Sequence, residues 1–348
     1  MMRGTITRLV LVVGGCIVAS FAAEAHDLVV CAYGCQYSTV QSAVDSARSG
    51  DTIRIGSGTY FENVLIDQKS LMLVGAGEDK TTIDGRFRAP VFMIGTPGEG
   101  VDLSKSVTLV GMTITHGRGT TGGGIAVSAE TLKIQYSIVA SNSATVSGGG
   151  IGLQTDLSAS MTHTVITHNR APVGGGIKVD AESVMLISDS TVARNTADLQ
   201  GGGLQLDEAA SVAVTGTTFS DNAARVDGGG IYVSNGIPAP GLSLTNSSIV
   251  ENIAARDGGG IFSRGRVVSD HTVIARNSAG RRGGGIGAFV GDRRVSVQLN
   301  DNFVIQNTAG TRGGGIFSDQ YTPQALSITS TTIQDNQPDE CNAVSGCP

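Results

Sequence analysis

A triplet of glycines recurs along most of the chain and places the strongest limit on its fold. Each triplet is followed by Ile or, once, by Leu, and successive triplets start 25 to 30 residues apart. The triplets begin at Gly122, Gly148, Gly174, Gly201, Gly228, Gly258, Gly283 and Gly313. The runs between them, such as "LQLD" and "SVAVTGTTF", alternate and are rich in β-branched residues, which predicts short strands. A unit this short cannot bury its own apolar face, so its copies must stack.

An asparagine precedes most of the triplets by six residues, and one of them by five. These residues are Asn142, Asn169, Asn195, Asn222, Asn252, Asn277 and Asn307. His116 takes the same slot in the first repeat. In parallel coils stacked about 4.8 Å apart, each Asn amide can donate to one neighbour and accept from the other. We therefore predict a buried asparagine ladder.

One repeat per coil of a parallel β-solenoid accounts for all of these elements. The glycines form a corner, and columns of Ile and Val form the core. Calcium-binding nonapeptide repeats, phosphate loops, leucine-rich repeats and propeller blades each require a period or motif that the chain lacks. The predicted fold class is an all-β, single-stranded parallel β-helix, right-handed by the usual crossover preference.

The region before the first triplet predicts an N-terminal cap. In "STVQSAVDSARSGD", Ser38 and Gln41 are placed as a capping box. Val40 and Val44 fall on one face of this short helix, and Gly50 provides a stop. Such a helix can cover the open end of a solenoid.

The N-terminus is typical of an export signal. Arg3 and Arg8 precede an apolar run that ends at the small-x-small sequence Ala23-Glu24-Ala25. Lipidation at Cys16 is the alternative. The chain thus divides into a signal peptide (1–25), a cap with the first coils (26–121), the repeat coils (122–336) and a Cys-containing tail (337–348).

Cleavage after Ala25 leaves four cysteines, an even number that is typical of disulfides in an exported chain. Cys31 and Cys35 lie at one end of the predicted stack, and Cys341 and Cys347 at the other. Many coils separate the two ends, far beyond the roughly 7 Å limit for a disulfide bridge. We therefore expect one local disulfide at each end.

Charge and hydropathy exclude two classes of partner. The net charge is −6 and the isoelectric point is about 5.4, which argues against nucleic acid. No segment of the mature chain is apolar enough to span a bilayer. The sequence places the protein outside the cytoplasm of a bacterium, whether extracellular, on the outer-membrane surface or in the periplasm.

Two stretches resemble known families. "TVQSAVDSARSGDTIRIGSGTYFENVLI" followed by "SLMLVGAGEDKTTIDG" looks like the entrance of pectin-lyase-like right-handed parallel β-helices. The alternation of "GGGI" with "FSDN" resembles the GGA-I and F-x-x-N repeats of polymorphic outer-membrane proteins. The first resemblance implies the fold and allows carbohydrate chemistry. The second implies a surface role.

Alternation along the strand after each triplet assigns residues to an outward, flat and solvated side. The residues four and six positions after the first glycine of each triplet, called the fourth and sixth positions, then form columns along the stack. The fourth-position column includes the candidate ligand-binding residues Lys178, Gln205, Tyr232 and Phe262. Tyr232 and Phe262, with Phe317, would form an exposed aromatic stripe, interrupted at Gly287. Residues just before four triplets would form a charged column along one edge, which provides solubility and weak coil-to-coil pairing; they are Asp227, Asp257, Arg282 and Arg312.

Asp180 and Asp207 become neighbours in this arrangement, with Glu208 behind them. Stacked carboxylates can hold a calcium ion, and Arg264 on the same patch can act as a base. These residues are the catalytic and metal candidates for a polysaccharide lyase or glycoside hydrolase acting on uronate-type glycans. The simpler interpretation is a solvated strand face. No Trp is present to stack on a sugar ring, and the acidic motifs of polygalacturonases and pectin methylesterases are missing.

From the sequence we favour an exported, non-catalytic scaffold that binds a glycan or a surface protein. It requires no cofactor. The carbohydrate-active enzyme is the alternative, and calcium is the ion that it would use.

Overall fold

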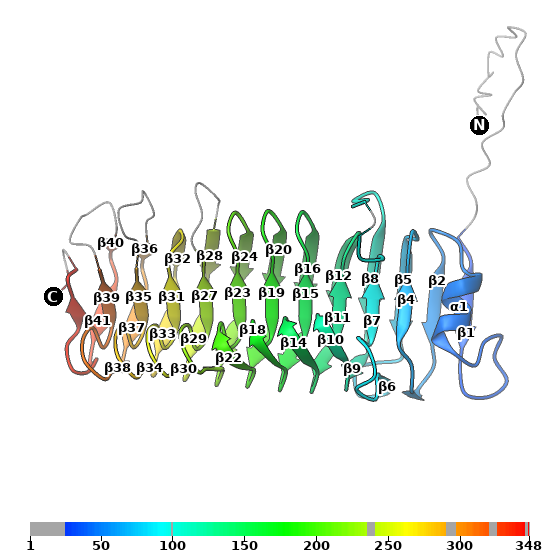
Figure 1. The fold of residues 1–348 in the computed structure, drawn as a ribbon, viewed down its shortest axis with the longest axis horizontal. Helices are drawn as coiled ribbons and strands as arrows, with labels where there is room; N and C mark the ends of the chain where they lie inside the picture. The colour runs from blue at the N-terminus through cyan, green and yellow to red at the C-terminus, as the bar shows by residue number, and fades with distance from the viewer. Residues whose placement is uncertain are drawn as a thin grey trace, which may run out of the picture.

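The computed structural model describes residues 25–98, 100–234, 241–289, 297–319, 326–344 and 347. The predicted signal peptide and Cys16 lie outside them, apart from Ala25. The described chain forms an elongated stack of about eleven coils, with its first and last described strands at opposite ends of the stack (Figure 1). Every strand pairing is parallel, as in Ile177↔Leu204 and Leu204↔Ile231. The predicted all-β solenoid is confirmed.

Four sheets run along the stack, and we name them A to D. Sheet A has twelve strands: β1 (Asp27–Val30), β2 (Thr52–Ile55), β5 (Leu71–Gly75), β8 (Ser106–Val110), β12 (Thr131–Gln135), β16 (Ser158–Thr162), β20 (Val184–Ser188), β24 (Ser211–Thr215), β28 (Gly241–Thr245), β32 (Val267–Asp270), β36 (Val297–Asn300) and β40 (Leu326–Thr329).

Sheet B follows sheet A in each coil. It has eleven strands: β3 (Gly58–Tyr60), β6 (Thr81–Asp84), β9 (Thr113–Thr115), β13 (Ile138–Ala140), β17 (Val165–Thr167), β21 (Thr191–Ala193), β25 (Thr218–Ser220), β29 (Ser248–Val250), β33 (Val273–Ala275), β37 (Phe303–Ile305) and β41 (Thr332–Gln334).

Sheet D lies between sheet B and the glycine triplet. It has eight strands: β10 (Arg118–Thr121), β14 (Ser143–Ser147), β18 (Arg170–Val173), β22 (Thr196–Gln200), β26 (Ala223–Ala224), β30 (Ile253–Ala254), β34 (Ser278–Ala279) and β38 (Thr308–Ala309).

Sheet C follows the triplet. It has eleven strands: β4 (Val64–Ile66), β7 (Phe92–Ile94), β11 (Ile125–Val127), β15 (Ile151–Leu153), β19 (Ile177–Val179), β23 (Leu204–Leu206), β27 (Ile231–Val233), β31 (Ile261–Ser263), β35 (Ile286–Ala288), β39 (Ile316–Ser318) and β42 (Cys341–Asn342). β42 pairs with β39, so part of the tail continues the stack.

The long alternating run of each repeat is two strands rather than one. In "SVAVTGTTF", β24 ends at Thr215 and β25 begins at Thr218, with Gly216 between them at a φ of 59°. Positive φ at this position turns the chain from sheet A into sheet B. Inward side chains such as Val192 and Phe219 are fully buried in the core.

The asparagine ladder is confirmed. The Oδ1 of Asn222 accepts from the backbone N–H and from the Nδ2 of Asn195, each at 3.0 Å, and the same pattern links Asn222 to Asn252. The Nδ2 of each Asn also donates to a backbone carbonyl of the preceding coil, as Asn222 does to Val192 at 2.8 Å. Each of these ladder amides is therefore paired through both its oxygen and its nitrogen.

Asn169 keeps its place in the ladder although it is one residue closer to its triplet. It bonds to Asn142 and Asn195 at 3.1 and 3.0 Å. The missing residue is absorbed by a register shift in sheet D, where β18 is one residue shorter than β14 and β22.

The first rung of the ladder corrects the prediction for His116. Gly117, not His116, donates its backbone N–H to Oδ1 of Asn142, at 2.7 Å. His116 is the corner residue before the rung, with a φ of 54°, as Arg194 is before Asn195. The sequence comparison was one residue out because the first coil has no side chain at the rung.

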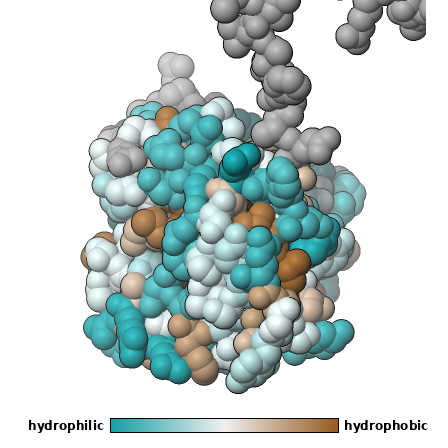
Figure 2. All heavy atoms as spheres, turned by 90° about the vertical axis from the view of Figure 1, so that its right-hand side faces the viewer, coloured by the Kyte–Doolittle hydropathy of each residue, from teal (hydrophilic) through white to brown (hydrophobic). Residues whose placement is uncertain are grey.

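The N-terminal helix is present, with a different cap from the predicted one. Helix α1 (Val40–Ser46) begins after Thr39, whose hydroxyl accepts from the N–H of Ser42. The carboxylate of Glu62 accepts from the N–H groups of Val40 and Gln41, so a neighbouring coil completes the cap. The predicted Ser38–Gln41 box is therefore wrong. The helix covers one end of the stack, and that end is largely hydrophilic with separate hydrophobic patches (Figure 2).

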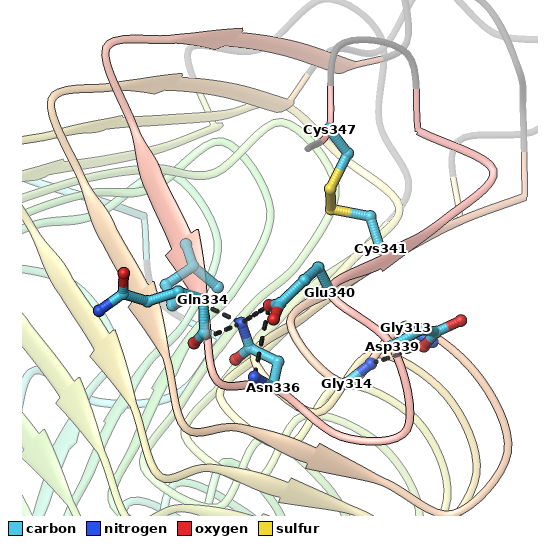
Figure 3. The surroundings of a disulfide bond; sticks show 9 residues. Gly313, Gly314, Gln334, Asn336, Asp339, Glu340, Cys341 and Cys347 are labelled. Carbon is cyan, nitrogen blue, oxygen red and sulfur yellow. Dashed lines mark hydrogen bonds between the residues drawn. A yellow bond between two sulfur atoms is a disulfide. The ribbon is translucent and has the colours of Figure 1, made fainter.

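Both predicted local disulfides are confirmed. Cys31 pairs with Cys35 and Cys341 pairs with Cys347. Beside the second disulfide, Glu340 ends the asparagine ladder: its carboxylate accepts from Nδ2 of Asn336 at 2.6 Å and from the N–H of the same residue at 3.3 Å (Figure 3). Glu340 thus substitutes for the Asn that a further coil would provide.

We predict that Asn222→Ala lowers the free energy of unfolding by about 2–4 kcal/mol. The substitution leaves the buried N–H and Nδ2 of Asn195 and the carbonyl of Val192 without the hydrogen bonds that Asn222 makes to them. Urea denaturation measures the change. Asn300→Ala, at a half-exposed position in β36, is the matched control and should change stability by less than about 0.5 kcal/mol. Equal losses of unfolding free energy in the two variants would contradict the conclusion that the buried hydrogen bonds of the ladder stabilise the fold.

Candidate functional site

The glycine triplet forces a sharp turn that makes the outer side of sheet C concave. Gly201 has a φ of 67°, and a Cβ on Gly202 would lie 2.2 Å from the carbonyl oxygen of Gly229. The turn brings sheet D in front of sheet C: a Cβ on Gly152 would lie 2.6 Å from Cγ2 of Thr121 in β10. The predicted solvated face is therefore wrong for the fourth-position residues, whereas most sixth-position residues, such as Asp180 and Arg264, are half-exposed or exposed. The fourth-position column is buried in the corner between the two sheets.

At the N-terminal end of this corner the column is small, and a groove opens. Ala126 and Gly152 leave space there, and the groove has a volume of about 620 Å³. Its described lining is Arg88, Ala89, Pro90, Met93, Pro97, Arg118, Gly119, Thr120, Thr121, Ala126, Ser128, Thr145 and Gln154. None of these lining residues is a carboxylate. The groove offers two guanidinium groups, several hydroxyls and an amide over an apolar floor.

Sequence reasoning missed the groove because Arg88 and Arg118 lie at or before the first repeat. The later repeats have no residues equivalent to these two arginines, so a comparison of repeats could not single them out. The signal that could have found it is the pair of successive small residues, Ala126 and Gly152, in a column that carries long side chains in every later coil except that of Gly287.

The next coils bring Lys178, Asp180 and Asp207 together, as predicted from register. The Nζ of Lys178 donates to Oδ1 of Asp180 at 2.7 Å and forms a second ion pair with Asp207. The lysine side chain is buried, whereas the carboxylates are 29% and 38% exposed. Nε2 of Gln205 donates to Asp207 at 3.2 Å, and its Oε1 is buried without a partner.

Lys178 supplies the positive charge that the calcium hypothesis assigned to an ion between the two carboxylates. Glu208 is exposed and does not join Asp180 and Asp207 as a third ligand within 4.8 Å. Arg264 is exposed and lies near the ring of Phe262, 5.5 Å from its centroid. Among the described ion pairs, neither carboxylate contacts Arg264. The proposed catalytic trio is thus not brought together.

The aromatic stripe is continuous, and all of its rings but the half-buried Phe289 are buried, which corrects the expectation of an exposed, interrupted one. Tyr232 stacks on Phe262 at 4.9 Å, Phe262 on Phe289 at 4.8 Å, and Phe289 lies 5.2 Å from Phe317. Phe289 fills the gap because Gly287 has no side chain: a Cβ there would lie 2.9 Å from its ring. Tyr232 and Phe262 are 5% and 1% exposed, so a ligand cannot stack on their faces without displacing neighbours.

The charged column before the triplets is also buried in part. Asp227 and Asp257 are almost completely buried, which corrects the expected surface column, whereas the expected coil-to-coil pairing is present between Asp257 and Arg282. Asp227 pairs with Arg256, and Asp257 pairs with Arg281 and Arg282. Burial alone would raise the pKa of Asp257, but hydrogen bonds from Arg281 and Arg282 outweigh it and hold the pKa below its usual value. Arg282 also lies over the rings of Phe289 and Phe317, so this network braces the aromatic stack.

Three exposed histidines lie at corners of the stack. His163, His168 and His271 all have positive φ at turns between strands. His271 is exposed, and it shares with Asp270 and Asp301 the one described cluster of three potential metal ligands within 4.8 Å.

One titratable group departs strongly from its usual behaviour. Burial raises the pKa of Glu130, in the turn after β11, to about 7, and the nearby Asp67 and Asp102 add to the rise. The N–H groups of Gln68 and Lys69 oppose it. No sequence signal pointed to Glu130, because the residues that cover it belong to a connection outside the repeats.

Comparison with known proteins identifies the architecture. The family model described as "Right handed beta helix region" matches residues 98–278, about half of the chain. The chain belongs to this family. The hand predicted from the crossover preference is therefore confirmed.

Individual relatives are more distant. A probable pectinesterase/pectinesterase inhibitor of Arabidopsis thaliana is 36% identical over 96 residues, which cover 25% of this chain and only 15% of that protein. ORF18 of Geobacillus virus E2 has a TM-score of 0.50 at 14% identity, and the match covers 84% of this chain and 56% of that chain. Pectin methylesterase PemA from Erwinia chrysanthemi has a TM-score of 0.37 at 14% identity, covering 73% and 80%. These structural likenesses show the fold alone. No helix in the described part of the chain is long and apolar enough to cross a bilayer.

We predict that Lys178→Met destabilises the β-helix by about 1–2 kcal/mol, because two carboxylates lose their shared counter-ion. The loss is smaller than for a fully buried pair because both carboxylates are partly exposed. Thermal unfolding measures it, and adding Asp180→Asn and Asp207→Asn should restore stability. Calcium should rescue the single variant and not the triple one. An unchanged melting temperature in Lys178→Met would contradict the assigned counter-ion.

Glu130 predicts a specific pH dependence in metal-free buffer. Its pKa is raised on folding from 4.5 to about 7, so the folded state binds the extra proton. The contribution of Glu130 to stability is therefore fully present below pH 4.5 and falls by up to about 3 kcal/mol as the pH rises to 7. Denaturation between pH 5 and 8 tests this. Glu130→Gln should flatten the slope, and an unchanged slope in that variant would contradict the assignment.

Proposed function

We propose that the protein is an exported, non-catalytic β-helix scaffold that binds a glycan in the groove between sheets C and D. The observation that carries the proposal is the groove itself. It combines an apolar floor with a few polar groups, as ligand sites commonly do, and its described lining lacks any carboxylate that could serve as general acid or base.

The chemistry of the lining favours a glycan that carries an acidic group. Arg88 and Arg118 can pair with a carboxylate or a sulfate, because a guanidinium binds planar anions through two parallel hydrogen bonds. Thr120, Thr121 and Gln154 can exchange hydrogen bonds with sugar hydroxyls. Met93 and Pro90 can contact the apolar face of a sugar ring.

Sequence features support placement of this scaffold outside the cytoplasm. The N-terminal stretch is typical of an export signal, and the described cysteines form two disulfides. The "GGGI" and Asn repeats resemble those of polymorphic outer-membrane proteins, which supports an adhesive role at a cell surface.

A polysaccharide lyase or hydrolase is the second candidate. Lys178 with Asp180 and Asp207 is the observation that favours it, since these groups lie one coil beyond Gln154 at the edge of the groove. The short match to a pectinesterase-like protein points to the same class of glycan. Against it, the Nζ of Lys178 is already engaged by Asp180 and Asp207.

Calorimetric titration with oligogalacturonate and with a neutral hexasaccharide tests the proposal. We expect tighter binding of the acidic chain, weakened at least tenfold by Arg118→Gln. Arg54→Gln, an exposed arginine of sheet A, is the control and should bind normally. Product analysis should show no cleavage.

Failure of both glycans to bind would contradict the proposal. Cleavage that Asp207→Asn abolishes would replace it with the enzyme.

A further inference from the structure

The backbone of His26, just before β1, is held by two hydrogen bonds to the chain around the start of β2. Its N–H donates to Oδ1 of Asp51 at 2.8 Å, and its carbonyl accepts from the N–H of Thr52 at 2.9 Å. One bond lies on each side of the Cα. The position of the His26 nitrogen is therefore fixed by contacts with the neighbouring coil.

Asp51, in the turn between α1 and β2, is a buried carboxylate with mainly neutral partners. Its side chain is 6% exposed, and its Oδ2 accepts from the N–H of Arg48 at 2.7 Å. Among the described residues, no Lys or Arg side chain forms an ion pair with it. The imidazole of His26 lies 3.6 Å away at Nδ1, but that ring is 63% exposed. A buried carboxylate without a firm positive partner is costly.

The nitrogen that Asp51 contacts is also the one that the predicted export cleavage would release. The small-x-small sequence ends at Ala25, so the cut falls between Ala25 and His26, which are both exposed. Hydrolysis by the host's signal peptidase adds one water across this peptide bond. The Ala25 carbonyl carbon becomes a carboxylate, and the His26 nitrogen becomes an α-amino group, which is protonated at neutral pH.

We propose that Asp51 binds the α-ammonium group of the processed chain, and that this ion pair fastens the start of β1 to the turn after α1. The proposal rests on the export of the protein and on no feature of its glycan binding. The amide N–H that Asp51 accepts in the uncut chain is replaced by an ammonium N–H on the same atom. A charge-assisted hydrogen bond is roughly twice as strong as a neutral one.

The surroundings of His26 have room for the new charge. His26 lines a pocket of about 330 Å³ together with Gln36, Tyr37 and Arg48, among other residues. The two ammonium N–H groups that do not face Asp51 can therefore remain hydrated. The ammonium loses only part of its water, while Asp51 gains the positive partner that it lacks.

The ion pair forms only after the cut, so processing should stabilise the end of the stack. Strand β1 is the first strand of sheet A and lies with β2 and α1 at one end of the molecule (Figure 1). Terminal strands fray unless they are tied down. The ion pair ties down β1 in the processed chain more strongly than the amide does in the precursor.

Expression of the full chain in a bacterium tests the proposal, with N-terminal sequencing and thermal unfolding of the exported protein. We expect the processed chain to begin at His26. One Ala inserted between Ala25 and His26 leaves an extra residue after the cut and moves the ammonium away from Asp51. The melting temperature should then fall by at least about 2 °C.

Asp51→Asn should remove the difference in melting temperature between the two chain starts. Asp27→Asn is the matched control, because Asp27 adjoins His26 but is 54% exposed and pairs with Arg54. This control should leave the difference unchanged.

Acylation of the α-amine separates the ion pair from a purely structural role of Asp51. Only the unprotonated amine reacts, and the ion pair keeps the proton on the nitrogen. At pH 7 the His26 amine should react at least tenfold more slowly in the wild type than in Asp51→Asn, and Asp27→Asn should react as the wild type does. Mass spectrometry of the N-terminal peptide measures the rate.

Three results would each overturn the proposal while leaving the glycan-binding groove untouched. They are an exported chain that begins at another residue, equal melting temperatures for the two chain starts, and equal acylation rates in wild type and Asp51→Asn. Retention of the uncut chain inside the cell would contradict export itself. If Asp51→Asn does not fold, the inserted Ala still tests the ion pair.

Discussion

The asparagine ladder is the interaction on which the rest of the structure depends. Each rung places an amide inside the stack, where an unpaired polar group would be costly, and the next coil satisfies it with two hydrogen bonds of about 3.0 Å. The ladder therefore fixes the spacing and register of successive coils at one corner. Its two ends are closed by different groups, the backbone of Gly117 at the start and the carboxylate of Glu340 at the finish.

The register that the ladder fixes at that corner also aligns the glycine triplets of successive coils. The glycines let the backbones of successive coils approach closely, and the tight turn leaves sheet C concave on its outside. One column of side chains then decides the character of each coil. Small residues open a groove near the N-terminus, Lys178 neutralises two carboxylates in the middle, and stacked rings fill the corner beyond Tyr232. A uniform backbone thus carries several distinct surfaces.

The features that the sequence predicts well are those that repeat. The ladder, the inward columns, the local disulfides and the proximity of Asp180 and Asp207 all follow from a fixed period. The errors arise where the prediction depends on whether an outward side chain is exposed to water or covered by another part of the chain. Alternation places Tyr232 and Phe262 on the outside of sheet C, and only the folded structure shows that they are buried there. Glu130 and Arg88 were missed because neither belongs to a repeated column. The place of Phe289 in the stack was missed because its ring fills the space beside Gly287 although Phe289 stands two residues further along the chain.

Hydrogen–deuterium exchange with and without an acidic oligosaccharide tests the central claim, that the concave corner with a small floor is the binding surface. Peptides that contain Arg118–Thr121 and Thr145 should exchange more slowly when the glycan is present, and peptides from the aromatic stack should not change. Protection confined to the outer faces of sheets A and B would contradict the account, because those faces lack the groove on which it depends.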